Sequence, residues 1–208
     1  MIGVLKYKAG NLASVANALN RLDANYFFAS TPEELESARA VIFPGVGHAG
    51  TAMDSLRELE ADQWLRQTDK LVLGICVGMQ LMFEGSEEGD TEGLGIFPGT
   101  LKKFDEKEAK VPHMGWNTFN NQVDHPLLTN ISEKEFLYYV HSYYADPIED
   151  TIASCNYIQD FSAVVAKRNF MGVQFHPEKS GKAGSMILQN FLDIVYSTKN
   201  QESYSFVK

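Results

Sequence analysis

Short apolar segments alternate with helix-like segments through the first half of this chain, and the alternation restricts the folds open to it. Four segments are short and apolar enough to be buried strands, namely residues 2–5, 26–29, 40–43 and 71–75. Between them, residues 11–22 repeat apolar side chains at a helical period, and Thr31-Pro32-Glu33-Glu34 has the N-cap, proline and capping-box glutamate of a helix start. A helix over 50–66 completes a pattern that predicts a mostly parallel sheet with helices on both faces.

The second half of the chain changes to strand-like segments separated by short turns. These segments are residues 136–145, 151–157, 162–168 and 171–175, and a helix over 183–196 follows them. Strands joined by short turns pair antiparallel, so we expect an antiparallel extension of the sheet. We expect residues 1–198 to form a single domain and the polar residues 199–208 to be a fraying tail.

The composition excludes several classes of protein. A net charge of −9 and a pI near 5.0 argue against a broad nucleic-acid-binding face. Two cysteines, Cys76 and Cys155, are too few for a secreted disulfide scaffold. The first residues lack the basic and apolar regions of a signal peptide, and no apolar run reaches the roughly 18 residues of a membrane helix. We therefore expect a cytoplasmic protein with no membrane or nucleic-acid partner.

The stretch around Cys76 is the most informative about chemistry. It reads as a strand, then G-x-C-x-G, then a helix to about Phe83, which is the pattern of a nucleophile elbow with cysteine in place of serine. The glycines permit a sharp turn, and the helix N-terminus stabilises a thiolate. The alternative is a buried structural thiol, and this stretch alone leaves both open. Cys155 has no such surroundings, and we expect it to be structural.

A base for this thiol is offered by His176-Pro177-Glu178, which follows a predicted strand. The histidine could exchange a proton with the thiol, while Glu178 fixes the imidazole and Pro177 stiffens the backbone between them. An exposed His-x-Glu at a strand end is the simpler interpretation of an isolated triplet. The rival bases are the other histidines, of which His141 is the strongest: His48, His113, His125 and His141.

Together the two segments resemble the class I (triad) glutamine amidotransferase family, which carries G-x-C-x-G-x-Q at the elbow and H-P-E near the C-terminus. The matching residues are Gly74, Cys76, Gly78 and Gln80, followed by His176-Pro177-Glu178. Pro44-Gly45-Val46-Gly47 is similar to the family's glycine-rich oxyanion strand. The resemblance covers about residues 3–196 and implies a single-domain, three-layer α/β fold.

The resemblance also implies a mechanism, the hydrolysis of glutamine through a thioester on Cys76. His176 would serve as acid and base, with Glu178 as its support. The oxyanion hole would be formed by backbone at Gly45, Val46, Gly47 and Val77. The amino-acid end of glutamine would meet Gln80, Glu88 and the backbone at His141, Ser142 and Tyr143. No metal and no cofactor are expected.

Further motifs resemble one branch of this family, the free-standing glutaminase subunits of histidine biosynthesis. They are Pro112-His113-Met114-Gly115-Trp116-Asn117, Ser86-Glu87-Glu88-Gly89 and His176-Pro177-Glu178-Lys179-Ser180. This resemblance implies a heterodimer with a (β/α)8-barrel cyclase that receives the ammonia directly, and low activity without that partner. The interface residues expected are Asn11, Met114, Trp116, Tyr138 and Lys179, although core packing is the alternative for Trp116.

One segment departs from the branch. The usual opening is D-Y-G-x-G-N, whereas this chain has Lys6-Tyr7-Lys8-Ala9-Gly10-Asn11. Lys6 and Lys8 are the only support for an alternative acceptor, such as a synthase that aminates a surface sugar, and they leave the glutaminase chemistry untouched. Two further hypotheses stay open, a cysteine hydrolase of the related peptidase-like α/β family and a binding protein that keeps the fold without the activity.

Overall fold

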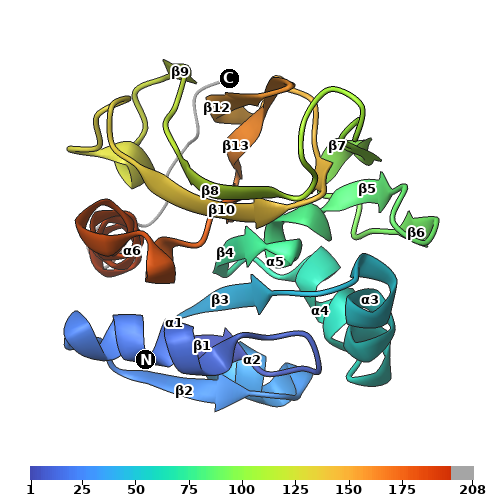
Figure 1. Ribbon diagram of the computed structural model, residues 1–208. Helices are drawn as coiled ribbons and strands as arrows, with labels where there is room; N and C mark the ends of the chain where they lie inside the picture. Colours follow the sequence, from blue (N-terminus) through green and yellow to red (C-terminus); the bar gives the residue numbers. More distant parts are fainter. Residues whose placement is uncertain (198–208) are drawn as a thin grey trace.

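The architecture is seen in a computed structural model that describes residues 1–197, so the predicted tail at 199–208 lies outside the described residues. Its centre is an eight-stranded sheet in the order β2-β1-β3-β4-β14-β13-β12-β9 (Figure 1). In that order the strands are Tyr26–Ala29, Ile2–Leu5, Ala40–Gly45, Leu71–Cys76, Phe170–Val173, Gln159–Lys167, Thr151–Tyr157 and Asn121–Gln122. The five from β2 to β14 are parallel, whereas β13, β12 and β9 pair antiparallel. This confirms the predicted parallel sheet with an antiparallel extension.

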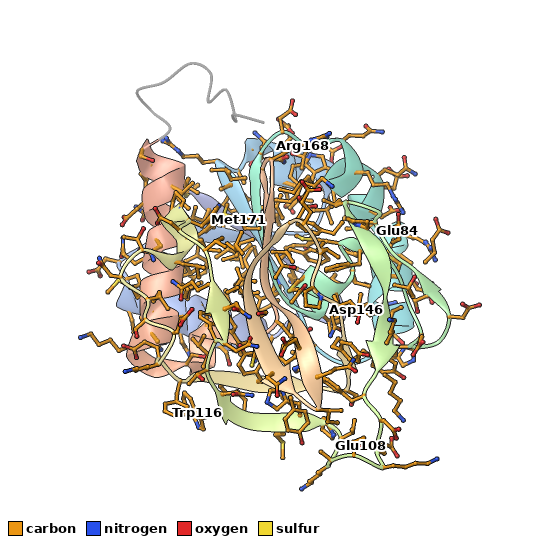
Figure 2. All side chains as sticks on the ribbon, turned by 90° about the horizontal axis from the view of Figure 1, so that it is seen from above. Glu84, Glu108, Trp116, Asp146, Arg168 and Met171 are labelled. Atoms are coloured by element: carbon orange, nitrogen blue, oxygen red, sulfur yellow. The ribbon has the colours of Figure 1, made fainter. Side chains whose placement is uncertain are left out.

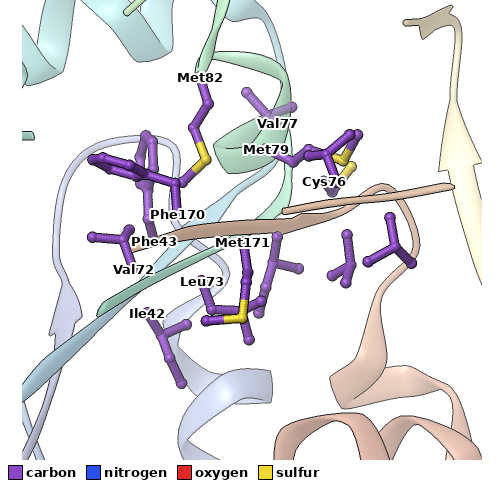
Figure 3. Packing of buried hydrophobic residues seen from close by; sticks show 14 of the residues in the cluster. Ile42, Phe43, Val72, Leu73, Cys76, Val77, Met79, Met82, Phe170 and Met171 are labelled. Carbon is purple, nitrogen blue, oxygen red and sulfur yellow. The ribbon is translucent and has the colours of Figure 1, made fainter. Parts of the chain in front are cut away.

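Helices cover both faces of the sheet, with α1 and α6 on one side and α3, α4 and α5 on the other (labelled in Figure 1, with the core between them in Figure 3). The α-helices are α1 Leu12–Arg21, α2 Pro32–Ser37, α3 Ala49–Glu58, α4 Ala61–Gln67, α5 Val77–Gln80 and α6 Gly181–Ser197. Alternate residues of the central strands therefore reach opposite apolar layers: Ile42 and Leu73 point to one side, and Phe43 to the other (Figure 3).

Two small sheets and two 3₁₀ turns were not predicted. One sheet pairs β8 (His113–Asn117) with β10 (Leu137–His141), and the other has the order β11-β7-β5-β6. The strands of the second are Tyr143–Tyr144, Phe97–Lys103, Phe83–Ser86 and Thr91–Glu92, and the 3₁₀ turns are η1 Pro126–Leu128 and η2 Pro177–Lys179. Two of these strands, β6 and β11, have two residues each, which is too short for a period to be visible in the sequence.

The prediction of one continuous helix over 50–66 is wrong, because the segment forms two helices, α3 and α4. Glu60 adopts a left-handed conformation with φ of 55°, which ends α3 and turns α4. The break lets Ala61 and Leu65 both become fully buried. Tertiary packing thus overrides a local pattern that contains no glycine or proline at the break.

The helix predicted from the elbow to Phe83 is also too long. Only Val77–Gln80 is helical, and Phe83 begins β5. The carbonyls of Leu81 and Met82 accept hydrogen bonds from the N–H groups of Leu94 and Ile96. A distant segment therefore takes the acceptors that a second helical turn would use.

Two strand limits and one cap also differ from the prediction. The third strand continues past residue 43 to Gly45, which pairs with Cys76. The strand predicted over 136–145 divides at Ser142, because β10 pairs with β8 and β11 pairs with β7. Thr31 caps α2 as predicted, but the Glu34 carboxylate accepts from the Ser30 N–H at 2.6 Å rather than from the N-cap residue.

We predict that Gly78→Ala lowers the free energy of unfolding by about 3 kcal/mol, because a Cβ there would lie 1.9 Å from the Phe43 carbonyl oxygen. Chemical denaturation of the two proteins measures the change. Gly50→Ala is the control, since its Cβ would meet only side chains at 3.2 Å or more, and its effect should stay within about 1 kcal/mol. Equal stabilities of Gly78→Ala and the native chain would contradict the close approach of β3 and α5.

Candidate active site

Cys76 lies on a strained turn at the carboxyl end of β4. Its φ is 53° and its ψ is −112°, a combination that non-glycine residues rarely adopt. The flanking glycines make the turn possible: a Cβ on Gly74 would lie 2.8 Å from the Met79 nitrogen, and one on Gly78 would clash with Phe43. The sharp strand-to-helix turn expected from G-x-C-x-G is present.

His176 and Glu178 form a buried pair at the end of the neighbouring strand, β14. His176 Nδ1 lies 2.8 Å from Glu178 Oε1, and both side chains are 1% exposed. The other ring nitrogen, Nε2, is buried and makes no hydrogen bond of good geometry within residues 1–197. The pair has the relative arrangement of a catalytic base and its orienting carboxylate, with the proton-exchanging nitrogen left available.

The surroundings of His176 favour the charged imidazolium. Burial lowers the pKa of His176, but interaction with Cys76 and the hydrogen bond to Glu178, together with the charges of both, outweigh burial and raise the pKa to about 10. The ring therefore carries a proton at neutral pH.

Two other groups contact the sulfur, and the Tyr7 hydroxyl lies by Gly45, which pairs with Cys76. Cys76 Sγ lies 3.8 Å from the Val140 carbonyl oxygen, and Gln174 Nε2 donates to the sulfur at 3.8 Å. The hydroxyl of Tyr7 is buried without a hydrogen-bond partner in the described residues and would lie 2.8 Å from a Cβ on Gly45. Burial, and secondly the charge of Cys76, raise the pKa of Tyr7 far above its usual range. Sequence reasoning assigned none of the three to the site, because only the folded chain brings them near Cys76.

A cavity of about 280 Å³ opens beside Cys76 and His176. Its lining also includes eight of the other predicted site residues: Val46, Gly47, Val77, Gln80, Glu88, His141, Ser142 and Tyr143. Gly45 and Glu178 are not in this lining, since Glu178 lies behind the His176 ring. Pro112 and Val140 complete the wall and were not predicted. Segments far apart in the sequence therefore meet at the carboxyl edge of the sheet, where open α/β sheets bind ligands.

Gln80 and Glu88 are both held by backbone. Gln80 Nε2 donates to the Tyr143 carbonyl oxygen and to Gln174 Oε1, each at 3.0 Å. Glu88 Oε2 accepts from the Ala49 N–H at 2.7 Å, at the N-terminus of α3. These bonds fix both side chains against the cavity wall and use both amide hydrogens of Gln80, which leaves its Oε1 as the atom that could accept from a ligand.

The predicted oxyanion strand has one N–H directed away from the cavity. The Val46 N–H donates to the Ala9 carbonyl oxygen at 2.7 Å. Gly47 follows with φ of 89°, and nothing lies within 4 Å of the Cβ that it lacks. In this conformation the Val46 N–H cannot bind an oxyanion, whereas Val77 opens the first turn of α5, whose N–H groups lack helical acceptors.

The rival histidines are occupied elsewhere. His141 Nδ1 lies 2.8 Å from the Tyr143 carbonyl oxygen, and burial lowers the pKa of His141 to about 3. Burial likewise lowers the pKa of His113 to about 4. His48 and His125 cap α3 and η1 through their Nδ1 atoms. Only His176 combines a buried position beside Cys76 with a raised pKa.

The predicted interface residues lie mostly on one exposed face of the β8–β10 sheet. Met114 is 59% exposed and Trp116 is 53% exposed, so the core interpretation of Trp116 is wrong (Figure 2). Tyr138 packs edge-on against Trp116, and Lys179 Nζ lies 5.9 Å above the Tyr138 ring. Asn11 precedes α1, which contacts η2 near Lys179. An additional large apolar side chain, Phe136, is 60% exposed just before β10.

Within residues 1–197, none of the helices is long and apolar enough to cross a membrane. Nor does that part of the chain bring together three or more His, Cys, Asp or Glu side chains in an arrangement that could hold a metal ion.

Comparison with known proteins gives concordant matches. The family model for class-I glutamine amidotransferases matches residues 7–195. Imidazole glycerol phosphate synthase subunit HisH of Bacteroides thetaiotaomicron is 47% identical and is matched over 93% of this chain and 99% of that protein. The proteins of the same name from Bacillus subtilis and Methanosarcina acetivorans are 48% and 46% identical, over 96% and 93% of this chain and 99% and 98% of those proteins.

Solved structures agree on the fold. A glutamine amidotransferase structure has a TM-score of 0.71 at 17% identity, over 94% of this chain and 98% of its own. The structure of PurLQS from Thermotoga maritima has a TM-score of 0.65 at 18% identity, over 93% of this chain and 98% of the matched one. At these identities the likeness concerns the fold alone.

We predict that Glu178→Gln lowers the pKa of His176 from about 10 by about one to three pH units, because a neutral amide no longer stabilises the imidazolium. NMR titration of the ring nitrogens measures it. The stability linked to this proton is complete below the ordinary pKa of 6.5 and is lost as the pH rises toward about 10, so the variant should lose it at lower pH.

Glu149→Gln is the matched control, since Glu149 is exposed. It should leave the His176 titration where it is in the native chain. An unchanged titration in Glu178→Gln would mean that the carboxylate does not support the ring.

Proposed function

The chain belongs to the class-I glutamine amidotransferase family, and we propose that it is the glutaminase subunit of an imidazole glycerol phosphate synthase. The observation that carries the proposal is the buried His176–Glu178 pair beside Cys76 on its strained turn, at the mouth of one cavity. Relatives that bear the name of this subunit, at 46–48% identity over nearly the whole chain, support the choice of synthase.

The proposed chemistry proceeds through a thioester. The Cys76 thiolate attacks the side-chain carbonyl carbon of glutamine, and the C–N bond breaks as His176 gives its proton to the departing ammonia. A water molecule then loses a proton to His176 and attacks the thioester, which releases glutamate and restores the sulfur. The raised pKa of His176 supports the first step, because the ring starts in the proton-donating form.

The amino-acid end of glutamine would occupy the far part of the cavity. We propose that the Glu88 carboxylate meets the α-ammonium group and that Gln80 contributes its Oε1. The backbone of His141, Ser142 and Tyr143 would receive the α-carboxylate. A cavity of about 280 Å³ lies at the small end of ligand pockets, which suits a single amino acid.

The partner would be a (β/α)8-barrel cyclase that takes the ammonia directly and forms imidazole glycerol phosphate and an aminoimidazole carboxamide ribotide in histidine biosynthesis. Free ammonia is protonated in neutral water and diffuses away, so direct transfer is chemically favoured. The exposed face of β8 and β10, with Met114, Trp116 and Tyr138, is the docking surface we propose. Exposed Trp, Tyr and Met side chains are typical of interface centres.

Activation by the partner would follow from the oxyanion strand. The Val46 N–H is bound to the Ala9 carbonyl oxygen, so the isolated chain would lack this oxyanion donor and hydrolyse glutamine slowly. Loss of one such donor costs about 100- to 1000-fold in rate in other enzymes. Docking of the cyclase would free the Val46 N–H from the Ala9 carbonyl oxygen. Glutamine would then be hydrolysed rapidly only when the cyclase is present to use the ammonia.

A different acceptor synthase has no specific support from the lysines that suggested it. Lys8 Nζ lies 2.7 Å from Glu58 Oε2, so Lys8 has a partner within the chain. Lys6 is exposed. The proposed function therefore keeps the cyclase as the acceptor.

We predict that Cys76→Ala lowers ammonia release from glutamine by at least about 1000-fold in the complex with the cyclase, because no other group can form the thioester. A coupled assay for ammonia measures it, with and without the cyclase. The variant complex should still use added ammonium for synthesis, since the cyclase chemistry does not involve this cysteine.

Cys155→Ala is the control for loss of a buried thiol. Cys155 lies in β12 with its sulfur directed to the Asn156 carbonyl, away from the cavity. The glutaminase activity of the Cys155→Ala complex should therefore remain near that of the native complex. Full glutaminase activity in Cys76→Ala would end the proposal.

We predict that Trp116→Ala weakens binding to the cyclase by about 30-fold, or about 2 kcal/mol, because a half-exposed indole at an interface centre is a typical hot spot. Titration calorimetry of the two proteins measures the affinity. Phe28→Ala is the matched control, since Phe28 is 41% exposed on β2, an edge strand of the eight-stranded sheet, whereas β8 belongs to the separate β8–β10 sheet. Equal losses in the two variants would rule out the β8–β10 face as the docking surface.

A further inference from the structure

Two buried side chains converge on one backbone carbonyl at the cavity wall. The Tyr143 carbonyl oxygen accepts from Gln80 Nε2 at 3.0 Å and from His141 Nδ1 at 2.8 Å. The preceding carbonyl, that of Ser142, accepts from the Phe104 N–H at 3.0 Å. Both peptide groups that flank Tyr143 are therefore held by named donors.

The strand pairing then determines where the Tyr143 N–H points. Because the Ser142 carbonyl bonds across to Phe104, Tyr143 occupies the non-hydrogen-bonded position opposite Lys103 in the antiparallel β11–β7 ladder. In an extended residue the N–H and C=O point to the same side. The Tyr143 N–H therefore faces the side on which its carbonyl meets Gln80 and His141, which is the side of the cavity.

The histidine that holds this carbonyl is fixed in one tautomer by a second histidine. A carbonyl only accepts, so His141 carries its hydrogen on Nδ1 and has an acceptor at Nε2. His113 Nδ1 lies 3.0 Å from that Nε2 and must donate to it. His113 Nε2 in turn lies 3.4 Å from Asn117 Nδ2, whose other hydrogen goes to the Asn156 carbonyl oxygen at 2.9 Å. Every donor in this series has an acceptor.

Aromatic rings hold the two imidazoles in place. His113 lies between Tyr157 and Tyr139, with ring centroids 4.1 and 5.0 Å away, and His141 contacts Phe161 at 5.0 Å. His113 is 4% exposed and His141 is 5% exposed. Burial lowers the pKa of both, so both stay neutral and keep one donor and one acceptor each.

We infer that His141 and His113 are positioning residues for substrate: together they fix the Tyr143 carbonyl and thereby aim the backbone of residues 142–143 at the α-carboxylate of glutamine. This inference rests on the proposed glutaminase function. A buried polar pair stabilises a fold less than apolar residues of similar size would. We therefore assign the His141–His113 pair to the orientation of the Tyr143 carbonyl rather than to stability. The pair acts on the binding end of the substrate and not on the Cys76 thioester, so it should affect KM more than kcat.

The experiment compares ammonia release by complexes of the native chain, His141→Leu, His141→Gln and His113→Phe with the cyclase. His141→Leu and His113→Phe should raise KM for glutamine about 10-fold while kcat stays within about 3-fold, because each variant loses two hydrogen bonds of the series. His141→Gln keeps a donor and an acceptor, so its KM should return to within about 3-fold of the native value. Alkylation of Cys76 by iodoacetamide in the isolated chains should proceed at equal rates.

His125→Asn is the matched control, since His125 only caps η1 and asparagine retains a capping oxygen. It should leave both constants unchanged. A native KM in His141→Leu and His113→Phe, or a KM in His141→Gln as high as in His141→Leu, would overturn the inference. If the native complex itself releases no ammonia, the proposed function fails instead.

A measurement on the native chain covers the case in which the apolar variants do not fold. Nitrogen NMR of the imidazoles should show hydrogen on Nδ1 and a bare Nε2 for both His113 and His141, unchanged between pH 5 and about 9. The opposite tautomer on His141 would contradict the inference, because Nδ1 could then no longer donate to the Tyr143 carbonyl.

Discussion

The close approach of β3, β4 and α5 is the constraint on which the rest of the site depends. The Phe43 carbonyl oxygen lies 1.9 Å from the position that a Cβ on Gly78 would take, and the Gly78 nitrogen lies 2.5 Å from the position of a Cβ on Gly45. No side chain fits between these backbones. The contact fixes the helix directly against the strand, and Cys76 must take a positive φ to connect them. The cost of that strain, about 1 to 3 kcal/mol, is offset by a fully buried core on both faces of the sheet.

The histidines of this chain show how environment assigns chemical roles. His176 and His141 are both buried at the same cavity, and burial alone disfavours the charge on each ring. His176 interacts with Cys76 and has the Glu178 carboxylate on Nδ1, and its pKa rises to about 10. His141 has a backbone carbonyl on Nδ1 and a second imidazole on Nε2, and its pKa falls to about 3. The neighbours of each ring therefore decide which histidine can carry a proton and which one positions the backbone.

Much of the fold could be predicted because its central strands are apolar and regularly spaced. The elbow glycines and His176-Pro177-Glu178 were visible for a related reason, since their chemistry needs residues close in sequence. The parts that could not be predicted depend on long-range contacts. Glu60 breaks a helix to bury Ala61 and Leu65, and the Val46 N–H is bound by a carbonyl 37 positions earlier, at Ala9. Neither leaves a local pattern, and the Tyr7 hydroxyl, which has no hydrogen-bond partner within residues 1–197, is likewise visible only in three dimensions.

Strand β8 has different tasks on its two faces. His113 and Asn117 point inward to the imidazole series, whereas Met114 and Trp116 point outward. A strand has a side-chain period of two, so a slip of one residue against β10 would exchange these faces. The Trp116 indole would then point to the polar interior, and the His113 imidazole would be exposed at the surface. Insertion or deletion of a single residue between 113 and 117 would therefore remove the inner support and the outer surface together, which makes this stretch intolerant of length changes that ordinary loops accept.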